Sequence, residues 1–253
     1  MLKIENLHVK IEEKEVLTGI DLEIDTGETY ILFGPNGSGK TTLLMVLMGL
    51  GDYEITDGKI WFKGHDITRM TTHERARLGI GMSFQRPPTI HGLSTRHLVT
   101  MAAQGRDIDV ESMARKVNME SFLGRDVNSG FSGGEIKRSE LLQLMAQNPG
   151  LLLFDEPESG VDLENMHLIG KTVRTLLEGD IAPRPDKSMR EQKEMARTTS
   201  GLIITHTGYI LDYINADRGQ VLYDGHLCCE ARPRDILEHI RAHGYRECVR
   251  CLK

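Results

Sequence analysis

The sequence predicts an α/β protein that has a mixed sheet in its core, an N-terminal antiparallel β element and a small helical subdomain. Apolar and polar residues alternate over residues 2–24, which is typical of paired antiparallel strands. An apolar run, a glycine-rich loop and a second apolar run follow one another over residues 30–48, the order expected of strand, loop and helix. Two short, mostly apolar runs at 151–154 and 201–205 are typical of strands buried on both faces of a sheet.

The composition indicates an ordinary globular protein. The chain has 253 residues, 39% hydrophobic and 27% charged, which suffices for a sizeable core and a smaller subdomain. No apolar segment approaches the roughly 18 residues of a membrane-spanning helix, and residues 1–6 lack the pattern of a signal peptide. A net charge of −6 without a basic block argues against a dedicated nucleic-acid surface. We therefore expect a cytoplasmic protein with no nucleic-acid partner and no direct membrane insertion.

The N-terminal part is predicted to be rich in strands. The expected elements are a hairpin of strands at 2–11 and 15–24, a turn at 25–28, a strand at 30–33, a helix at 42–48, a strand at 59–63 and a capped helix at 71–77.

The later part is predicted to alternate helices and buried strands. The expected elements are a strand at 79–85, helices up to about 147, a strand at 151–154, a helix at 163–178, a strand at 201–205, strands near 218–229 and a helix near 234–242. Residues 179–200 are polar and contain prolines, and we expect an exposed, mobile insertion there. The pattern assigns residues 1–90 and 148–253 to the core and residues 91–147 to the helical subdomain.

The glycine-rich loop predicts a binding site for a nucleoside triphosphate. Residues 34–41 read GPNGSGKT and match GxxxxGK[ST] between a predicted strand and helix. Glycines let successive N–H groups turn toward a phosphate, and the helix N-terminus adds its positive dipole end. A glycine-rich turn without function is the weaker interpretation, because strand and helix flank the loop. The predicted ligand-binding residues are Gly34, Asn36, Gly37, Ser38, Gly39, Lys40, Thr41 and Thr42.

Polar residues end three other predicted strands. Asp155 and Glu156 follow the run at 151–154, where one carboxylate can bind Mg²⁺ and the other can act as a general base. Gln85 and His206 occupy the ends of two further strands. Each of these residues, taken alone, could simply be a solvated residue at the end of a strand.

Two more segments begin predicted helices. Ser132-Gly133-Gly134-Glu135 has the S-x-x-E spacing of a capping box ahead of an apolar helix. The Ser132 hydroxyl could accept a backbone hydrogen bond and still donate one to a ligand. Asp162 fits an N-cap for a helix that begins at Leu163.

These motifs, in this order, resemble the ABC-type ATPases along essentially the whole chain. The resemblance implies the ABC ATPase fold, with hydrolysis of ATP to ADP and phosphate in the presence of Mg²⁺. It implies that Thr41, Gln85 and Asp155 hold Mg²⁺. It further implies that Glu156 is the general base and that His206 holds the γ-phosphate and the attacking water.

The resemblance also implies that two copies pair head to tail when ATP is bound. Ser132, Gly133, Gly134 and Glu135 of one copy would then face the nucleotide held by the other. Asp162 is expected either to cap the helix at Leu163 or to couple the two sites across the dimer.

Several local strings resemble the SufC-type ATPases of iron–sulfur cluster assembly. They lie at 52–58, 62–67, 130–138, 155–162, 203–206, 211–214 and 244–245. This resemblance implies SufB- and SufD-like scaffold partners, with the homodimer forming inside a hetero-oligomer. Pro157, a short segment between Gln85 and Phe131 and a long insertion near 179–200 depart from the SufC pattern. The alternatives are the ATP-binding subunit of a membrane transporter and a non-hydrolysing, nucleotide-gated clamp.

Two features of the sequence set further expectations. Residues 9–16 contain no aromatic ring that could stack on adenine, so Val9 or Ile11 would supply apolar contact and base discrimination would be loose. All four cysteines lie near the C-terminus, and they either serve a metal or redox role or are buried thiols without one. They are Cys228, Cys229, Cys248 and Cys251.

Overall fold

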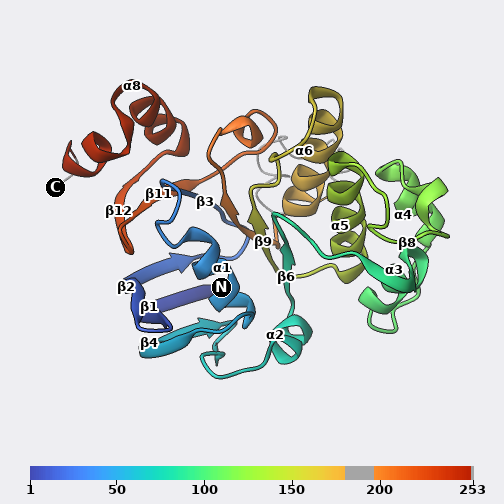
Figure 1. The fold of residues 1–253 in the computed structure, drawn as a ribbon, viewed down its shortest axis with the longest axis horizontal. Helices are drawn as coiled ribbons and strands as arrows, with labels where there is room; N and C mark the ends of the chain where they lie inside the picture. Colours follow the sequence, from blue (N-terminus) through green and yellow to red (C-terminus); the bar gives the residue numbers. More distant parts are fainter. Residues whose placement is uncertain (180–196, 252–253) are drawn as a thin grey trace, which may run out of the picture.

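A mixed six-stranded sheet forms the centre of the fold, in the order β12-β11-β3-β10-β9-β6 (Figure 1). Its strands are β3 (Thr29–Phe33), β6 (Ile80–Ser83), β9 (Leu151–Asp155), β10 (Ser200–Ile204), β11 (Arg218–Tyr223) and β12 (His226–Ala231). All neighbours are parallel except β12, which pairs antiparallel with β11. This computed structural model describes residues 1–179 and 197–251, so the predicted insertion at 179–200 lies mostly outside the described residues.

The central strands are buried on both faces, as their apolar runs predict. In β3, Tyr30 and Leu32 join one apolar cluster, whereas Ile31 and Phe33 join another. Successive side chains of a strand point to opposite faces, so one five-residue strand can serve two cores. The predicted α/β fold class with a mixed sheet is confirmed.

A four-stranded antiparallel sheet covers the first of these clusters together with α1 (Figure 1). Its order is β2-β1-β4-β5, with β1 (Leu2–Ile11), β2 (Lys14–Ile24), β4 (Glu54–Phe62) and β5 (His65–Asp66). The predicted hairpin is therefore correct, and the strand predicted at 59–63 begins five residues earlier than expected. Helices α1 (Lys40–Met48) and α2 (Thr72–Leu78) complete this part, the latter with a capping box between Thr71 and Glu74.

The segment predicted to be helical also contains a small sheet. Its helices are α3 (Thr95–Ala102), α4 (Val110–Lys116), the 3₁₀ helix η1 (Glu120–Phe122) and α5 (Gly133–Gln147). Strands β7 (Ile90–Ser94) and β8 (Asp126–Val127) pair with each other, which corrects the all-helical prediction. Strands of five and two residues are too short to show a periodicity of their own. These helices share an apolar cluster of their own, while the division at 91 and 147 stays a prediction.

The second face of the central sheet packs against the C-terminal helices. They are α6 (Leu163–Glu178), the 3₁₀ helix η2 (Tyr209–Asp212) and α8 (Pro233–Cys251). The helix predicted near 234–242 is present as the first part of α8; α8 is interrupted at Gly244, whose φ of 76° is not helical, and a second helical stretch follows to Cys251. The strand predicted at 79–85 is too long, because Phe84 donates its N–H to the Glu140 side chain instead of to a strand.

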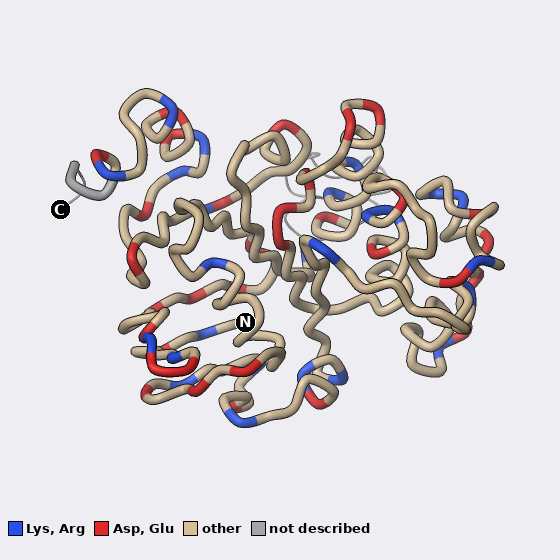
Figure 2. The backbone as a smooth tube through the Cα atoms, viewed as in Figure 1, with Lys and Arg blue, Asp and Glu red and all other residues tan. Residues whose placement is uncertain are grey.

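None of the helices within residues 1–179 and 197–251 combines the length and apolarity that crossing a membrane requires. Lys and Arg are interspersed with Asp and Glu over the whole described chain (Figure 2).

A buried arginine joins α2 to the end of α1. The Arg75 side chain is 1% exposed, and its guanidinium donates to the carbonyls of Val46 and Leu47 in the last turn of α1. It also donates to the carbonyls of Met70 at 2.9 Å and Thr68 at 3.1 Å. The last carbonyls of a helix have no partner within the helix. The Val46 carbonyl also accepts from the Gly49 N–H and the Tyr53 hydroxyl, so Arg75 adds a charged donor there and supplies one to the Leu47 carbonyl.

We predict that Arg75→Met lowers the free energy of unfolding by about 3 kcal/mol, because buried carbonyls lose a charged donor. Urea unfolding monitored by circular dichroism would measure the loss. Arg77→Met is the matched control, since Arg77 lies on the same helix and is exposed. Equal stability of the two variants would contradict the assignment.

Candidate functional site

The central strands bring the predicted site residues to one edge of the sheet. Because β3, β6, β9 and β10 are parallel, the segments that follow their carboxyl ends lie side by side. A cavity of about 370 Å³ opens at this edge. It is lined by Val16, Asn36, Gly37, Gly39, Lys40, Thr41, Thr42, Gln85, Glu156 and His206.

The glycine loop forms a phosphate cradle ahead of α1. Gly39 precedes the helix in a left-handed conformation with a φ of 102°, which side chains rarely adopt. The Lys40 ammonium lies over the loop and donates to the carbonyls of Gly34 and Pro35, both at 2.9 Å. Burial lowers the pKa of Lys40, whereas the nearby carboxylates of Asp155 and Glu156 raise it. This arrangement places one cation among backbone N–H groups, which suits a polyphosphate.

Two buried oxygens in this region fit an incoming ligand and a metal ion. Asp155 is 2% exposed, and its Oδ1 has no hydrogen-bond partner among the described residues. The Thr41 hydroxyl lies near the Asp155 carboxylate, so a hydroxyl and a carboxylate stand together, as Mg²⁺ ligands do. Burial raises the pKa of Asp155, which a divalent cation at this position would counteract. Ser38 Oγ is likewise buried without a partner in the described chain.

Glu156 is held between Gln85 and His206. Gln85 Nε2 donates to Glu156 Oε2 at 2.8 Å, and His206 Nε2 lies 2.6 Å from Glu156 Oε1. The backbone of Glu156 has a φ of 49°, an unfavourable conformation for a side chain of this size. Burial lowers the pKa of His206, as does the Lys40 charge, while Glu156 acts in the opposite direction. The three polar side chains thus line one cavity, and Glu156 contacts both of the others.

The apolar wall of the cavity differs from the prediction. Val9 is fully buried in the core between the paired strands β2 and β4, and Ile11 does not line the cavity. Val16, on β2, lines it instead. The alternation along residues 15–24 could have indicated Val16, because it precedes the core residue Leu17 and therefore faces outward.

The predicted segment Ser132–Glu135 begins α5 and does not line the cavity of its own chain. The capping box is present: Ser132 Oγ accepts from the Glu135 N–H, and Glu135 Oε2 accepts from the Ser132 N–H at 2.7 Å. Gly133 lies so close to the loop before α6 that an added Cβ would stand 2.6 Å from the Gly160 carbonyl oxygen. Gly134 lies equally close to Asn165 on α6. These two glycines therefore set the distance between α5 and the loop that follows Glu156.

Asp162 caps α6, which was one of its two predicted roles. Its Oδ1 accepts from the Asn165 N–H at 2.8 Å, and its Oδ2 accepts from Asn165 Nδ2 at 2.8 Å. These bonds satisfy an unpaired donor in the first turn of the helix. The coupling role stays a prediction.

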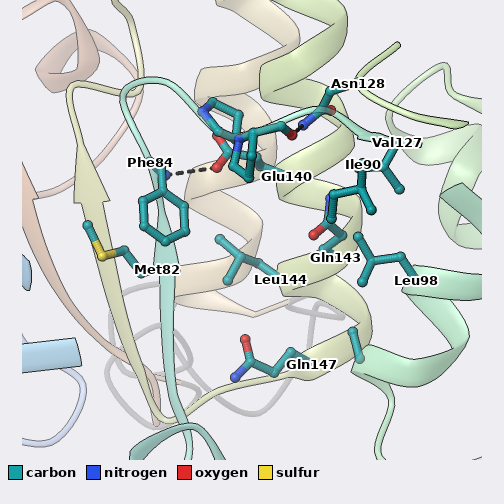
Figure 3. A pocket seen from close by; sticks show the side chains of 13 residues that line it. Met82, Phe84, Ile90, Leu98, Val127, Asn128, Glu140, Gln143, Leu144 and Gln147 are labelled. Atoms are coloured by element: carbon teal, nitrogen blue, oxygen red, sulfur yellow. Dashed lines mark hydrogen bonds between the residues drawn. The ribbon is translucent and has the colours of Figure 1, made fainter. Parts of the chain in front are cut away.

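A second hollow, of about 280 Å³, lies between β6, β7 and the helices α3 and α5 (Figure 3). Its wall is largely apolar, with Phe84 and Leu144 from one side and Leu98 from the other. At the wall of this hollow, Glu140 accepts from the Phe84 N–H at 2.8 Å, and the Lys137 ammonium donates to the Phe84 carbonyl. Burial raises the pKa of Glu140 and lowers that of Lys137. No local sequence pattern indicates this pair, which connects the residue before Gln85 to α5.

The C-terminal thiols form no metal-binding group of three or more His, Cys, Asp or Glu residues within the described part of the chain. Cys228 and Cys229 do not simply alternate along β12, because Cys229 has a φ of 57° at an irregularity of the strand pairing. The Cys229 thiol donates to the Cys248 carbonyl at 2.9 Å. The Cys251 side chain lies outside the described residues.

Comparisons with known proteins agree along nearly the whole chain. The family model described as ABC transporter matches residues 17–159. A protein of Escherichia coli K12, named as a probable ATP-dependent transporter SufC, is 36% identical over 97% of each chain. A Cyanidium caldarium protein, named as a probable ATP-dependent transporter ycf16, is 36% identical over 97% of this chain and 95% of its own. A Streptococcus pyogenes serotype M3 protein, named as a probable ABC transporter ATP-binding protein, is 35% identical over 90% and 87%.

Solved structures show the same fold at lower identity. A nucleotide-free ATP-binding cassette from an ABC transporter superposes with a TM-score of 0.73 and 22% identity, over 96% of this chain and 95% of its own. The dimeric cassette MJ0796, in a post-hydrolysis state with ADP and phosphate, gives a TM-score of 0.72 and 22% identity, over 92% and 98%.

We predict that Gly133→Ala destabilises the protein by about 1–3 kcal/mol, because the new methyl group would meet a backbone carbonyl that cannot rotate away. Thermal unfolding would measure the change. Gly124→Ala is the control, since a Cβ there would meet nothing within 4 Å. If both variants unfold alike, α5 and the loop before α6 are not in fixed contact.

Proposed function

The chain belongs to the ABC transporter family, and from that premise we propose that it powers a SufB- and SufD-like scaffold in iron–sulfur cluster biogenesis. It is an ATPase that converts ATP to ADP and phosphate and uses Mg²⁺. The observation that carries the proposed chemistry is the contact of Glu156 with both Gln85 and His206 at the edge of the phosphate cradle.

In the proposed mechanism, the loop N–H groups and Lys40 hold the phosphates of ATP. Thr41, Asp155 and Gln85 would hold Mg²⁺, which supplies positive charge beside the phosphates when bound. Glu156 accepts a proton from the attacking water, because its carboxylate is anchored on two sides and faces the cavity. His206, whose pKa is lowered by burial and by the Lys40 charge, holds the water and the γ-phosphate by hydrogen bonding.

The cavity is completed by a second copy in this proposal. Ser132–Glu135 lies away from the cavity of its own chain, and its helix N-terminus is free to face an anion on another chain. Two large apolar side chains stand exposed close to site residues, Leu163 at 89% beside Asp162 and Tyr209 at 57% after His206. Apolar groups exposed beside a functional edge suit an interface that forms when ATP is bound.

The apolar hollow beside Gln85 is the proposed docking surface for the scaffold (Figure 3). An occupant there would contact Phe84, whose backbone is held by Lys137 and Glu140 and which directly precedes Gln85. Such a contact would connect the partner with Glu156 through one side chain. The Escherichia coli relative is named SufC, which supports the proposed role, whereas the Streptococcus pyogenes relative is named an ABC transporter ATP-binding protein. A transporter subunit is therefore the second candidate function.

We predict that Glu156→Gln lowers ATP turnover at least 100-fold, because the amide cannot accept the proton. Size-exclusion chromatography with ATP and Mg²⁺ should then show an accumulated dimer. Glu164→Gln is the matched control, since Glu164 is exposed in the first turn of α6. Unchanged turnover in Glu156→Gln would refute its role as the base, whereas the absence of turnover in the unaltered protein would favour the non-hydrolysing clamp.

We predict that an affinity pull-down from native cytosol and membranes recovers a soluble SufB-like scaffold, identified by mass spectrometry. Leu98→Asp should reduce the recovery about tenfold, because it places a charge in the apolar hollow. Met101→Asp, on the same helix but 60% exposed and outside the hollow, should not. Recovery of an integral membrane protein instead would make the chain a transporter subunit.

A further inference from the structure

The loop after β9 contacts the end of β10, and the residues that follow it, at several successive positions. β9 and β10 are parallel neighbours, with Asp155 beside Ile204. The Glu156 N–H donates to the Ile204 carbonyl at 3.1 Å, and the Glu156 side chain contacts His206. Two residues further on, the chain turns back, with the Ser159 N–H donating to the Glu156 carbonyl at 3.0 Å. The turn brings a second carboxylate, Glu158, against the same segment.

Glu158 is a buried carboxylate that touches both neighbours of His206. Glu158 is 8% exposed. Its Oε1 accepts from the hydroxyl of Thr205, in a short contact, and from the hydroxyl of Thr207 at 3.1 Å. One oxygen atom therefore binds the residues on both sides of His206.

The two threonines extend this hold into the following turn. Thr205 Oγ1 accepts from the Gly208 N–H at 2.8 Å, and Thr207 Oγ1 accepts from the Tyr209 N–H at 3.3 Å. Arg241, on α8, donates to the Thr207 carbonyl at 2.9 Å. The segment around His206 is thus fixed by several hydrogen bonds at Thr205 and Thr207, and Glu158 is the acceptor that both threonine hydroxyls share.

We propose that Glu158 is a positioning residue for ATP hydrolysis, which holds His206 in contact with Glu156 by binding the hydroxyls of Thr205 and Thr207. The inference rests on the proposed roles of Glu156 and His206 and adds a residue outside the cavity to them. A small backbone rotation at either threonine would move the imidazole far enough to lose its contact with Glu156. The hydrogen bonds from the two hydroxyls to Glu158 oppose such a rotation.

A direct chemical role for Glu158 fits the structure less well. Glu158 does not line the cavity, whereas Glu156 does. Glu158 Oε1 accepts from two hydroxyls, and its Oε2 is buried without a hydrogen-bond partner in the described chain. Burial raises the pKa of Glu158, but an acceptor oxygen is present in either protonation state. Its role therefore requires an acceptor at this position, and not a charge.

Two substitutions distinguish a requirement for a hydrogen-bond acceptor at position 158 from a requirement for a charge. Glu158→Gln keeps an acceptor oxygen, and we expect its kcat to stay within about threefold of the unaltered protein. Glu158→Leu removes the acceptor at similar size, and we expect its kcat to fall about tenfold, which corresponds to about 1.4 kcal/mol in the barrier. Binding of a fluorescent ADP analogue should change less than twofold in both. A tenfold loss in Glu158→Gln, or full activity in Glu158→Leu, would overturn the proposal.

A double-mutant cycle tests whether Glu158 acts through His206. His206→Ala alone should lower kcat strongly, and adding Glu158→Leu to it should lower kcat less than twofold further. A full tenfold additional loss would show that Glu158 acts elsewhere, and would overturn this inference alone. Unchanged turnover in His206→Ala would instead refute the proposed role of His206 and, with it, the positioning role.

A milder variant keeps the test possible if Glu158→Leu does not fold. Thr207→Val removes one of the two donors at an exposed residue, which makes it a mild change, and leaves the backbone intact. We expect a three- to fivefold fall in kcat with unchanged nucleotide binding. Thr100→Val, on the exposed face of α3, is the matched control and should have no effect. Equal kcat values for the two variants would overturn the proposal.

Discussion

The parallel pairing of β3, β6, β9 and β10 is the constraint on which the rest of the structure depends. Parallel strands end at the same edge of a sheet, so the four segments that follow them meet without any further folding information. The glycine loop, Gln85, the carboxylates after β9 and His206 are separated by long stretches of sequence and nevertheless form one cavity. Apolar residues on both faces of these strands hold the edge in place.

Buried polar and charged side chains hold loops and helix ends around the sheet, each in a different way. Arg75 satisfies the carbonyls at the end of α1. Lys137 and Glu140 hold both backbone groups of Phe84, and Glu158 holds the two threonines beside His206. An unpaired buried charge is costly, so each of these groups tolerates few alternative positions. Loops that would otherwise move are thereby kept in register with the strands.

These contacts also connect surfaces that lie apart. The apolar hollow reaches Phe84, and the following residue, Gln85, contacts Glu156. On the other side, Gly133 and Gly134 bring the start of α5 against the loop that leads from Glu156 to α6. A partner in the hollow and a second copy at α5 would thus both act on the same carboxylate.

The sequence by itself determined the α/β fold class, the glycine loop, the strand-end carboxylates and the helix caps at Ser132 and Asp162, because local spacing and side-chain chemistry specify these features. It missed the strands β7 and β8, which are too short to carry a periodic signal, and it placed the apolar wall at Val9 or Ile11 although Val16 lines the cavity. Only the tertiary structure decided which groups the buried carboxylates contact. Glu158 contacts Thr205 and Thr207, and Glu140 contacts Phe84, across more than 40 residues of chain. Such pairs depend on which loops the folded sheet brings together, and no local pattern of residues encodes that.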